Sequence, residues 1–295
     1  MATLRELKGR IGSVASSEKI TGAMKMISSA KMHKAESALK KQLPFRSQIE
    51  VIIGNLLSAD APVSSPLLEE RHVENLGIVV WGSDDGLCGA FNVNLFKILL
   101  GNISQYRAKY GDNVKITIIP VGAKMLKAAQ KIEDENITVY QVEGVDSKSD
   151  GDTVKKFTEN LRDAFIGKKL DQIDILYMNF KSISRQVPMT EQLLPISSEK
   201  FNGLGVDSAA SSRPYIFEPD AATIFRAVLP LYLLSLMQEV FTENRAAEQA
   251  ARVMAMQSAN DNAKKLLEQL QIEYNKLRQN NITTELLDIL GGQVK

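Results

Sequence analysis

The chain has 295 residues, of which 44% are hydrophobic, 24% charged and 6% aromatic, a composition typical of a soluble globular protein with a sizeable core. Its 36 Lys and Arg nearly balance its 35 Asp and Glu, which argues against a dedicated nucleic-acid binder, since such proteins carry a clear basic excess. A single cysteine, Cys88, excludes an internal disulfide and a multi-thiolate zinc site, and two histidines, His33 and His72, exclude a histidine-rich metal cluster.

The first predicted element is a long helix over residues 1–57. Its apolar residues are spaced three and four apart, as in the seam of a coiled coil, at Leu4, Leu7, Ile11, Val14, Ile20, Met24 and Ile27. The step from Val14 to Ile20 breaks this spacing, so we expect a local change of supercoil there. Three glycines weaken the helix, so packing must stabilise it.

The middle of the chain, residues 58–219, alternates short β-branched runs with helical patterns. The predicted strands are Leu76–Trp81, Val114–Val121, Ile137–Val142 and Ile173–Phe180. The predicted helices between them are Val93–Tyr110, Ala123–Lys131 and Thr153–Phe165. This alternation predicts a Rossmann-like α/β domain with a mostly parallel, helix-covered sheet, to which Val187–Leu194 adds an antiparallel edge strand.

The last predicted element is a helix within residues 220–295, capped by Asp220. Its helical rhythm is carried by Ile224, Val228, Leu231, Leu234, Val240, Phe241, Ala246, Ala247, Ala250, Val253, Met254, Leu266, Leu267, Leu270, Tyr274, Leu277 and Leu286. This helix would be roughly 100 Å long and the first one roughly 80 Å, whereas a compact chain of this size has a radius of gyration of about 19 Å. We therefore expect residues 1–57 and 220–290 to pair as an antiparallel coiled coil that projects as a rod.

The most enzyme-like stretch is the glycine-rich loop from Gly82 to Gly89, directly after the first predicted strand. Glycines in such a loop can approach a phosphate at the next helix N-terminus, which would suit a nucleotide-binding enzyme. The spacing matches neither the dinucleotide fingerprint nor the P-loop, and Asp84 and Asp85 would repel phosphate. We therefore favour a tight structural turn, in which Cys88 is packed and inert because no histidine stands in a Cys-His arrangement.

Other candidate groups suggest surfaces rather than catalysis. Residues 1–50 carry ten Lys and Arg against four Asp and Glu, a basic excess that is either a solvated face or a contact for an acidic collar. His33 is expected to be exposed on a solvated helical face, and His72 lies beside Arg71 in an apparent linker without metal-ligand spacing. No run of 18 apolar residues and no signal-peptide core is found, so we expect a cytosolic or peripheral chain that does not span a membrane.

Several stretches, in order along the whole chain, resemble the gamma subunit, or central stalk, of the F-type ATP synthase. They are Lys19–Met26 with Ala30–Met32, Ser83 with Gly86–Gly89 and Phe91-Asn92, Tyr215 and Phe217 before Glu218–Asp220, Glu243–Arg252 with Ala255-Met256, and Asn275-Lys276, Arg278-Gln279, Ile282-Thr283 and Glu285-Leu286.

This resemblance implies a non-catalytic rotor subunit, present in one copy, without cofactor, metal or nucleic acid. Its implied partners are the alpha and beta subunits of the catalytic hexamer, the epsilon subunit and the membrane c-ring. It further implies that the hexamer is contacted, and rotation coupled to catalysis, by Met24, Arg252, Gln279, Thr283 and Glu285, and that epsilon and the ring are contacted by Tyr215 and Phe217.

Two departures from the family pattern matter. Gly22 stands where the family commonly has a larger, often basic residue, which affects the stiffness and charge of the rod. A single cysteine makes the dithiol control of the chloroplast branch impossible, so the resemblance implies the cytoplasmic side of a bacterial inner membrane. Two alternatives remain open: a Rossmann-like nucleotide-binding enzyme with a helical dimerisation arm, and a free-standing coiled-coil scaffold that forms homodimers.

Overall fold

The computed structural model describes residues 3–57, 64–201 and 217–292. The chain divides into two compact units: a terminal unit, Met1–Ala30 with Arg252–Lys295, and a central unit, Lys31–Ala251.

Two long helices contribute to both units. Helix α1 spans Leu4–Leu57 and helix α5 spans Ala221–Gly292, as the sequence predicts. The carboxylate of Asp220 accepts a 2.8 Å hydrogen bond from the backbone N–H of Thr223, which confirms the predicted cap of α5. By length and composition α5 is apolar enough to cross a membrane, but 56% of its apolar window is buried inside the structure, as in the core helix of a protein interior.

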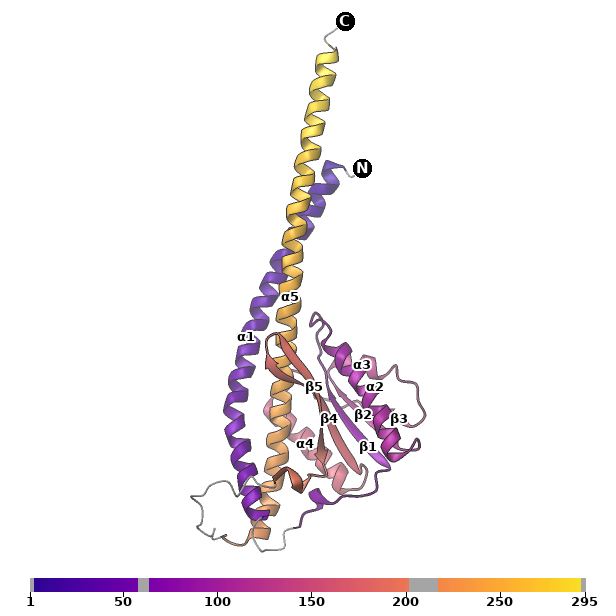
Figure 1. The fold of residues 1–295 in the computed structure, drawn as a ribbon, viewed down its shortest axis with the longest axis vertical. Helices are drawn as coiled ribbons and strands as arrows, with labels where there is room; N and C mark the ends of the chain where they lie inside the picture. The colour runs from indigo at the N-terminus through magenta and orange to yellow at the C-terminus, as the bar shows by residue number, and fades with distance from the viewer. Residues whose placement is uncertain (1–2, 58–63, 202–216, 293–295) are drawn as a thin grey trace. The chain divides into compact units, whose positions relative to one another are not determined.

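The central unit contains a five-stranded sheet in the order β3-β2-β1-β4-β5 (Figure 1). The strands are β1 (Asn75–Trp81), β2 (Lys115–Val121), β3 (Ile137–Val139), β4 (Gln172–Ser182) and β5 (Arg185–Leu194). The first four pair in parallel, and β5 pairs antiparallel with β4. This order confirms the predicted mostly parallel sheet and its antiparallel edge strand.

Both faces of this sheet are covered. Helices α2 (Phe91–Tyr110) and α3 (Ala123–Ala129) lie on one face, and α4 (Gly151–Ile166), the C-terminal end of α1 and the N-terminal part of α5 lie on the other (Figure 1). In β1, Ile78 and Val80 belong to the apolar core on the side of α2 and α3. Val79 and Trp81 belong to the apolar core on the side of α1, α4 and α5. A strand buried on both sides needs apolar residues at consecutive positions, which explains the continuous apolar run in β1.

In each unit α1 and α5 lie against each other. In the central unit Arg46 of α1 forms an ion pair of 2.9 Å with Glu239 of α5. In the terminal unit the side-chain amide of Asn260 in α5 donates a hydrogen bond to the backbone oxygen of Glu18 in α1. Because the position on α5 rises as the position on α1 falls, the two helices run antiparallel, as predicted.

The predicted seam of α1 is wrong at Ile20 and Ile27. Ile20 is 59% exposed and Ile27 is 55% exposed, whereas Met24 is half-buried. The three-and-four spacing continues without a slip, through the half-buried or buried positions Glu18, Thr21, Lys25 and Ser28. The helical period, and not the nearest apolar residue, decides which side chains face the partner helix.

The seam of α5 in the terminal unit shows the same effect. The prediction is wrong for Met254, Leu266 and Leu286, which are between 42% and 55% exposed. It is confirmed for Val253, Leu267, Leu270, Tyr274 and Leu277, which are buried or half-buried, and Met256, Asn260 and Ala263 complete the same spacing of three and four. From Arg278 to Leu290, every side chain that the structure describes is exposed.

Candidate functional site

The loop after β1 is built around a buried serine. The side chain of Ser83 is fully buried, and its hydroxyl accepts a 2.7 Å hydrogen bond from the amide of Asn92, whose oxygen accepts one from the backbone N–H of Ser83. A Cβ placed on Gly82 would lie 2.4 Å from that of Met125, so only glycine fits there. The loop is therefore tied to the first turn of α2 and pressed against α3.

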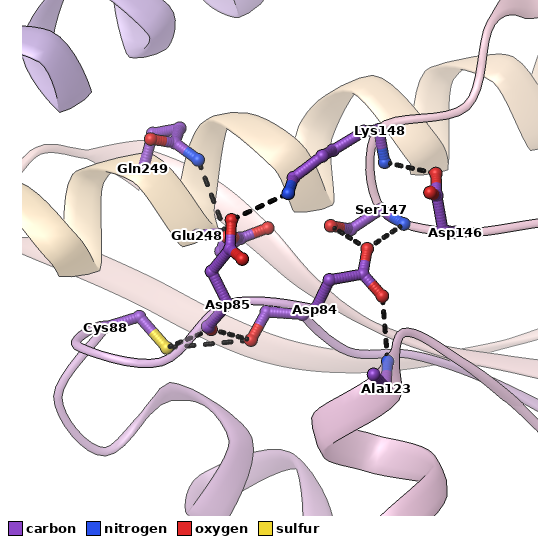
Figure 2. A network of polar contacts seen from close by, with 10 residues as sticks. Asp84, Asp85, Cys88, Ala123, Asp146, Ser147, Lys148, Glu248 and Gln249 are labelled. Carbon is purple, nitrogen blue, oxygen red and sulfur yellow. Dashed lines mark hydrogen bonds and ion pairs between the residues drawn. The ribbon is translucent and has the colours of Figure 1, made fainter.

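The carboxylate of Asp84 occupies the backbone donors that a phosphate would need. One oxygen accepts a 2.8 Å hydrogen bond from the N–H of Ala123, the first residue of α3, and the other accepts bonds from the N–H and the hydroxyl of Ser147 (Figure 2). An acidic side chain at a helix N-terminus is favourable for the same reason that a bound anion is. These contacts support the structural turn and weigh against a nucleotide cradle.

The neighbouring Asp85 forms a more exposed contact. Its carboxylate lies 2.9 Å from the ammonium group of Lys148, with side chains 60% and 56% exposed (Figure 2). The hydrogen bond that Lys148 donates to the carboxylate of Asp85 raises the pKa of Lys148. Figure 2 also shows Glu248 and Gln249 of α5 beside this loop, with Gln249 donating a hydrogen bond to Glu248. The loop thus lies beside α5 (Figure 2).

The sulfur and imidazole groups show no catalytic arrangement among the described residues. Cys88 is 2% exposed and accepts a hydrogen bond from the amide of Asn92, as expected for a packed cysteine. His33 is exposed, as predicted, and lies 3.5 Å from Glu36 on its own helix. His72 is exposed as well. Within the described ranges, no group of three or more His, Cys, Asp and Glu residues could hold a metal ion.

A cleft of about 540 Å³ opens elsewhere in the central unit. Its lining includes Thr117 and Ile119 of β2, Tyr140, and Phe157 and Asn160 of α4, and no residue of the Gly82–Gly89 loop. The cleft and the glycine-rich loop therefore do not form one site, which weakens the nucleotide-binding alternative further.

Polar side chains of α5 bind the helix to the sheet and to α1. Asn244 accepts a 3.0 Å hydrogen bond from the backbone N–H of Met178, and Glu243 accepts one of 2.7 Å from the amide of Asn179. Nearby, Ala246, Ala247 and Ala250 are fully buried, because small side chains let the helix approach its neighbours closely. No role of Glu243 and Asn244 is predicted from the sequence, in which the only signal is a pair of polar residues before an alanine-rich stretch.

This polar cluster contains buried acids. Burial raises the pKa of Glu243 to about 7, and repulsion from Glu239 adds to the shift. Burial also raises the pKa of Glu239, although its ion pair with Arg46 opposes the shift. Burial raises the pKa of Tyr232, beside Arg46, to about 12. The cluster forms a polar junction inside the central unit.

The predicted hexamer contacts fall into two groups. Gln279, Thr283 and Glu285 lie on the exposed end of α5, where the hydroxyl of Thr283 donates a 2.9 Å hydrogen bond to the backbone oxygen of Gln279. Met24 is half-buried in α1, and Arg252 is only 5% exposed. The structure therefore gathers three of the five on one exposed segment and leaves the other two inside the helix pair.

Large apolar side chains share this exposed end of α5. They are Ile282, Leu286, Leu287, Ile289 and Leu290, between 44% and 62% exposed. Exposed apolar residues gathered on one segment are typical of a contact surface for another protein.

The predicted contacts for epsilon and the ring precede α5. Phe217 is half-buried and packs against the core that α1, α4, α5 and the sheet form. Tyr215 lies outside the described residues.

Comparisons with known proteins extend over the whole chain. A family model described as ATP synthase matches residues 3–294. The ATP synthase gamma chain of Bacteroides fragilis is 40% identical, and that of Bacteroides thetaiotaomicron is 37% identical, each with 100% of both chains covered. In a solved structure of the Euglena gracilis mitochondrial ATP synthase (OSCP/F1/c-ring), one chain is similar at a TM-score of 0.64 and 21% identity, over 98% of this chain and 93% of that one.

Proposed function

Because the chain belongs to the ATP synthase gamma-chain family, we propose that it works as the rotating central stalk of an F-type ATP synthase. In this function it couples ion flow through the membrane c-ring to synthesis or hydrolysis of ATP in the alpha/beta hexamer. The observation that carries the proposal is the full-length similarity to gamma chains, at up to 40% identity among the relatives described above.

The chain contributes mechanics and no chemistry of its own. Torque applied to the central unit is transmitted along α1 and α5 to the terminal unit, whose unequal faces change the catalytic sites in turn. The polar junction of Arg46, Glu239 and Glu243 and the contacts of Asn244 fix α5 to the sheet and α1, which suits transmission of torque without slippage.

The exposed end of α5 is the proposed contact with the hexamer. Gln279, Thr283 and Glu285 supply polar contacts there, and the apolar side chains from Ile282 to Leu290 bury surface against the surrounding subunits. Met24 and Arg252 are proposed to contribute to coupling, and their burial favours a role in holding the helix pair as well.

The opposite contacts involve the segment before α5. Phe217 and Tyr215 are proposed to face the epsilon subunit and the c-ring. The complex is proposed to lie at a bacterial inner membrane, with this chain bound peripherally on the cytoplasmic side, one copy in each complex.

Co-purification tests this function directly. A tagged copy, taken from detergent-solubilised membranes of its own cell, is expected to bring the alpha, beta, epsilon and c subunits with it. Recovery of the chain alone, or as a homodimer in light scattering, would contradict the rotor function and favour the scaffold alternative. Titration calorimetry of the isolated chain with ATP and NAD is expected to show no tight binding, and tight binding would favour the enzyme alternative.

A further inference from the structure

The seam of α1 becomes polar within the terminal unit. After Val14, the positions that continue the three-and-four spacing are Glu18, Thr21, Lys25 and Ser28. Polar side chains at such positions bury little apolar surface, and apolar burial is the main force that holds a coiled coil together. Apolar burial along this seam is therefore weaker after Val14, and a polar contact adds to what holds this part of α1 against α5.

Asn260 of α5 supplies a polar contact at this place. Its side chain is 8% exposed, and its Nδ2 donates a 2.6 Å hydrogen bond to the backbone oxygen of Glu18. The same nitrogen donates to the hydroxyl oxygen of Thr21 at 3.3 Å, while that hydroxyl donates its own proton to the backbone oxygens of Ser17 and Glu18. The amide group of Asn260 therefore finds two hydrogen-bond acceptors on α1, at Glu18 and Thr21, where the two helices meet.

The contact depends on the glycine beside it. A Cβ on Gly22 would lie 3.3 Å from Nδ2 of Asn260, tighter than an ordinary van der Waals contact. The missing side chain leaves the hollow through which the amide reaches the backbone of α1. Gly22 and Asn260 thus complement each other in shape.

We propose that Asn260 and Gly22 form an interhelical clasp that keeps the segment of α1 from Leu4 to Ala30 docked on α5. The clasp also positions Met24, which lies half a turn beyond Gly22. Docking is a property of the chain alone, whereas the consequence for coupling rests on the proposed function.

Amide hydrogen exchange of the full chain tests the clasp. Asn260→Asp keeps the size of the side chain but replaces the donor with an acceptor, which repels the oxygen of Glu18. The expected result is exchange at least about tenfold faster across residues 4–30, the effect of losing one buried hydrogen bond. Exchange in β1 and β4 is expected to stay unchanged.

Asn262→Asp is the matched control, because Asn262 is exposed on the same helix and its substitution changes the charge equally. Faster exchange confined to residues 4–30 in Asn260→Asp alone supports the clasp. Unchanged exchange, a uniform change over the whole chain, or an equal change in both variants overturns it.

Gly22→Ala gives a second test, because the clasp and helix propensity predict opposite changes in the rate of amide exchange. Alanine in place of a helical glycine ordinarily stabilises the helix and slows exchange. The clasp predicts faster exchange, because the new Cβ crowds the amide of Asn260. In an Asn260→Ala background, Gly22→Ala is expected to slow exchange again, and slowing in both backgrounds would count against the clasp.

The consequence for coupling is measured in the assembled complex. Asn260→Asp is expected to lower the number of protons pumped for each ATP hydrolysed, relative to Asn262→Asp. If the unchanged chain fails to assemble with alpha and beta subunits, the proposed function fails, while the exchange experiment still decides the clasp. Equal pumping ratios in the two variants would remove Asn260 from coupling.

Discussion

Asn179 of β4 donates a 2.7 Å hydrogen bond to the carboxylate of Glu243 on α5, and both side chains are at most 9% exposed. This contact joins the sheet to the long helix next to the bond between Met178 and Asn244. Burial at this junction disfavours the charged form of Glu243 and raises the pKa of its carboxyl group to about 7. The junction should therefore respond to pH.

Glu243→Gln is expected to stabilise the chain at high pH. Glu243 binds its proton more tightly when folded, at a pKa of about 7, than at its ordinary value of 4.5. Its contribution to stability is thus complete below pH 4.5 and is lost as the pH rises through 7. Glutamine keeps the acceptor for Asn179 without the charge, so the variant should be more stable by about 3 kcal/mol at pH 8 and unchanged at pH 4.

Urea unfolding at both pH values measures this difference. Glu268→Gln on the exposed face of the same helix is the control and should not alter the pH dependence. If the Glu243→Gln variant has the same free energy of unfolding as the parent at every pH, ionisation of Glu243 does not destabilise the folded chain.

Arg46→Ala is expected to destabilise the central unit by about 2–4 kcal/mol, because it leaves a buried carboxylate unpaired. Arg46 lies 2.9 Å from both Glu50 and Glu239, and the side chain of Glu239 is only 10% exposed. Lys40→Ala is the control, because it removes a cation from the same helix whose side chain, paired with Glu36, is 71% exposed. Its free energy of unfolding is expected to change by no more than about 0.5 kcal/mol. Equal losses of unfolding free energy in the two variants would contradict this prediction.

Asp84→Ala is expected to cost about 1–3 kcal/mol, because three donors on Ala123 and Ser147 lose their acceptor. Asp85→Ala is the adjacent control, and its exposed pair with Lys148 predicts a change within about 0.5 kcal/mol. Thermal unfolding of both variants measures the difference. A similar small effect of both substitutions would show that the loop does not depend on Asp84.

The sheet, its covering helices and the start of α5 could be predicted from the sequence. Runs such as Leu76–Trp81 are apolar at consecutive positions and short, which identifies buried parallel strands, and Asp220 marks the start of α5. The loop at Asp84 is predicted to be a turn because the negative charge of its aspartates would repel phosphate. These features are local, so local patterns reveal them.

The pairing of the long helices was harder to predict because it depends on phase. Because Ile20 and Ile27 are apolar, they are predicted to lie in the seam of the coiled coil. The period of the helix instead places Glu18 and Lys25 in the seam. Likewise the partner of Glu243 is Asn179, which lies 64 residues away. No local pattern specifies which distant residue satisfies a buried polar group.

Met24→Lys is expected to impair coupling. Met24 is half-buried, and a lysine there adds a charge that must be kept in water. ATP-driven proton pumping by the assembled enzyme should fall, whereas Met26→Lys should have a smaller effect, since Met26 is 69% exposed. Normal pumping in Met24→Lys would remove this residue from the coupling contacts.

Glu285→Ala tests the proposed contact at the end of α5. All side chains described from Arg278 to Leu290 are exposed in the chain alone, so this segment gains little from folding and has its surface available for another subunit. Removal of one carboxylate there should leave the stability of the isolated chain unchanged within about 0.5 kcal/mol. In the assembled enzyme it should lower proton pumping, because a charged contact with the hexamer is lost. Glu273→Ala, exposed on the paired part of the same helix, is the control. Pumping that is equally reduced in both variants, or normal in Glu285→Ala, would show that the contact does not depend on this carboxylate.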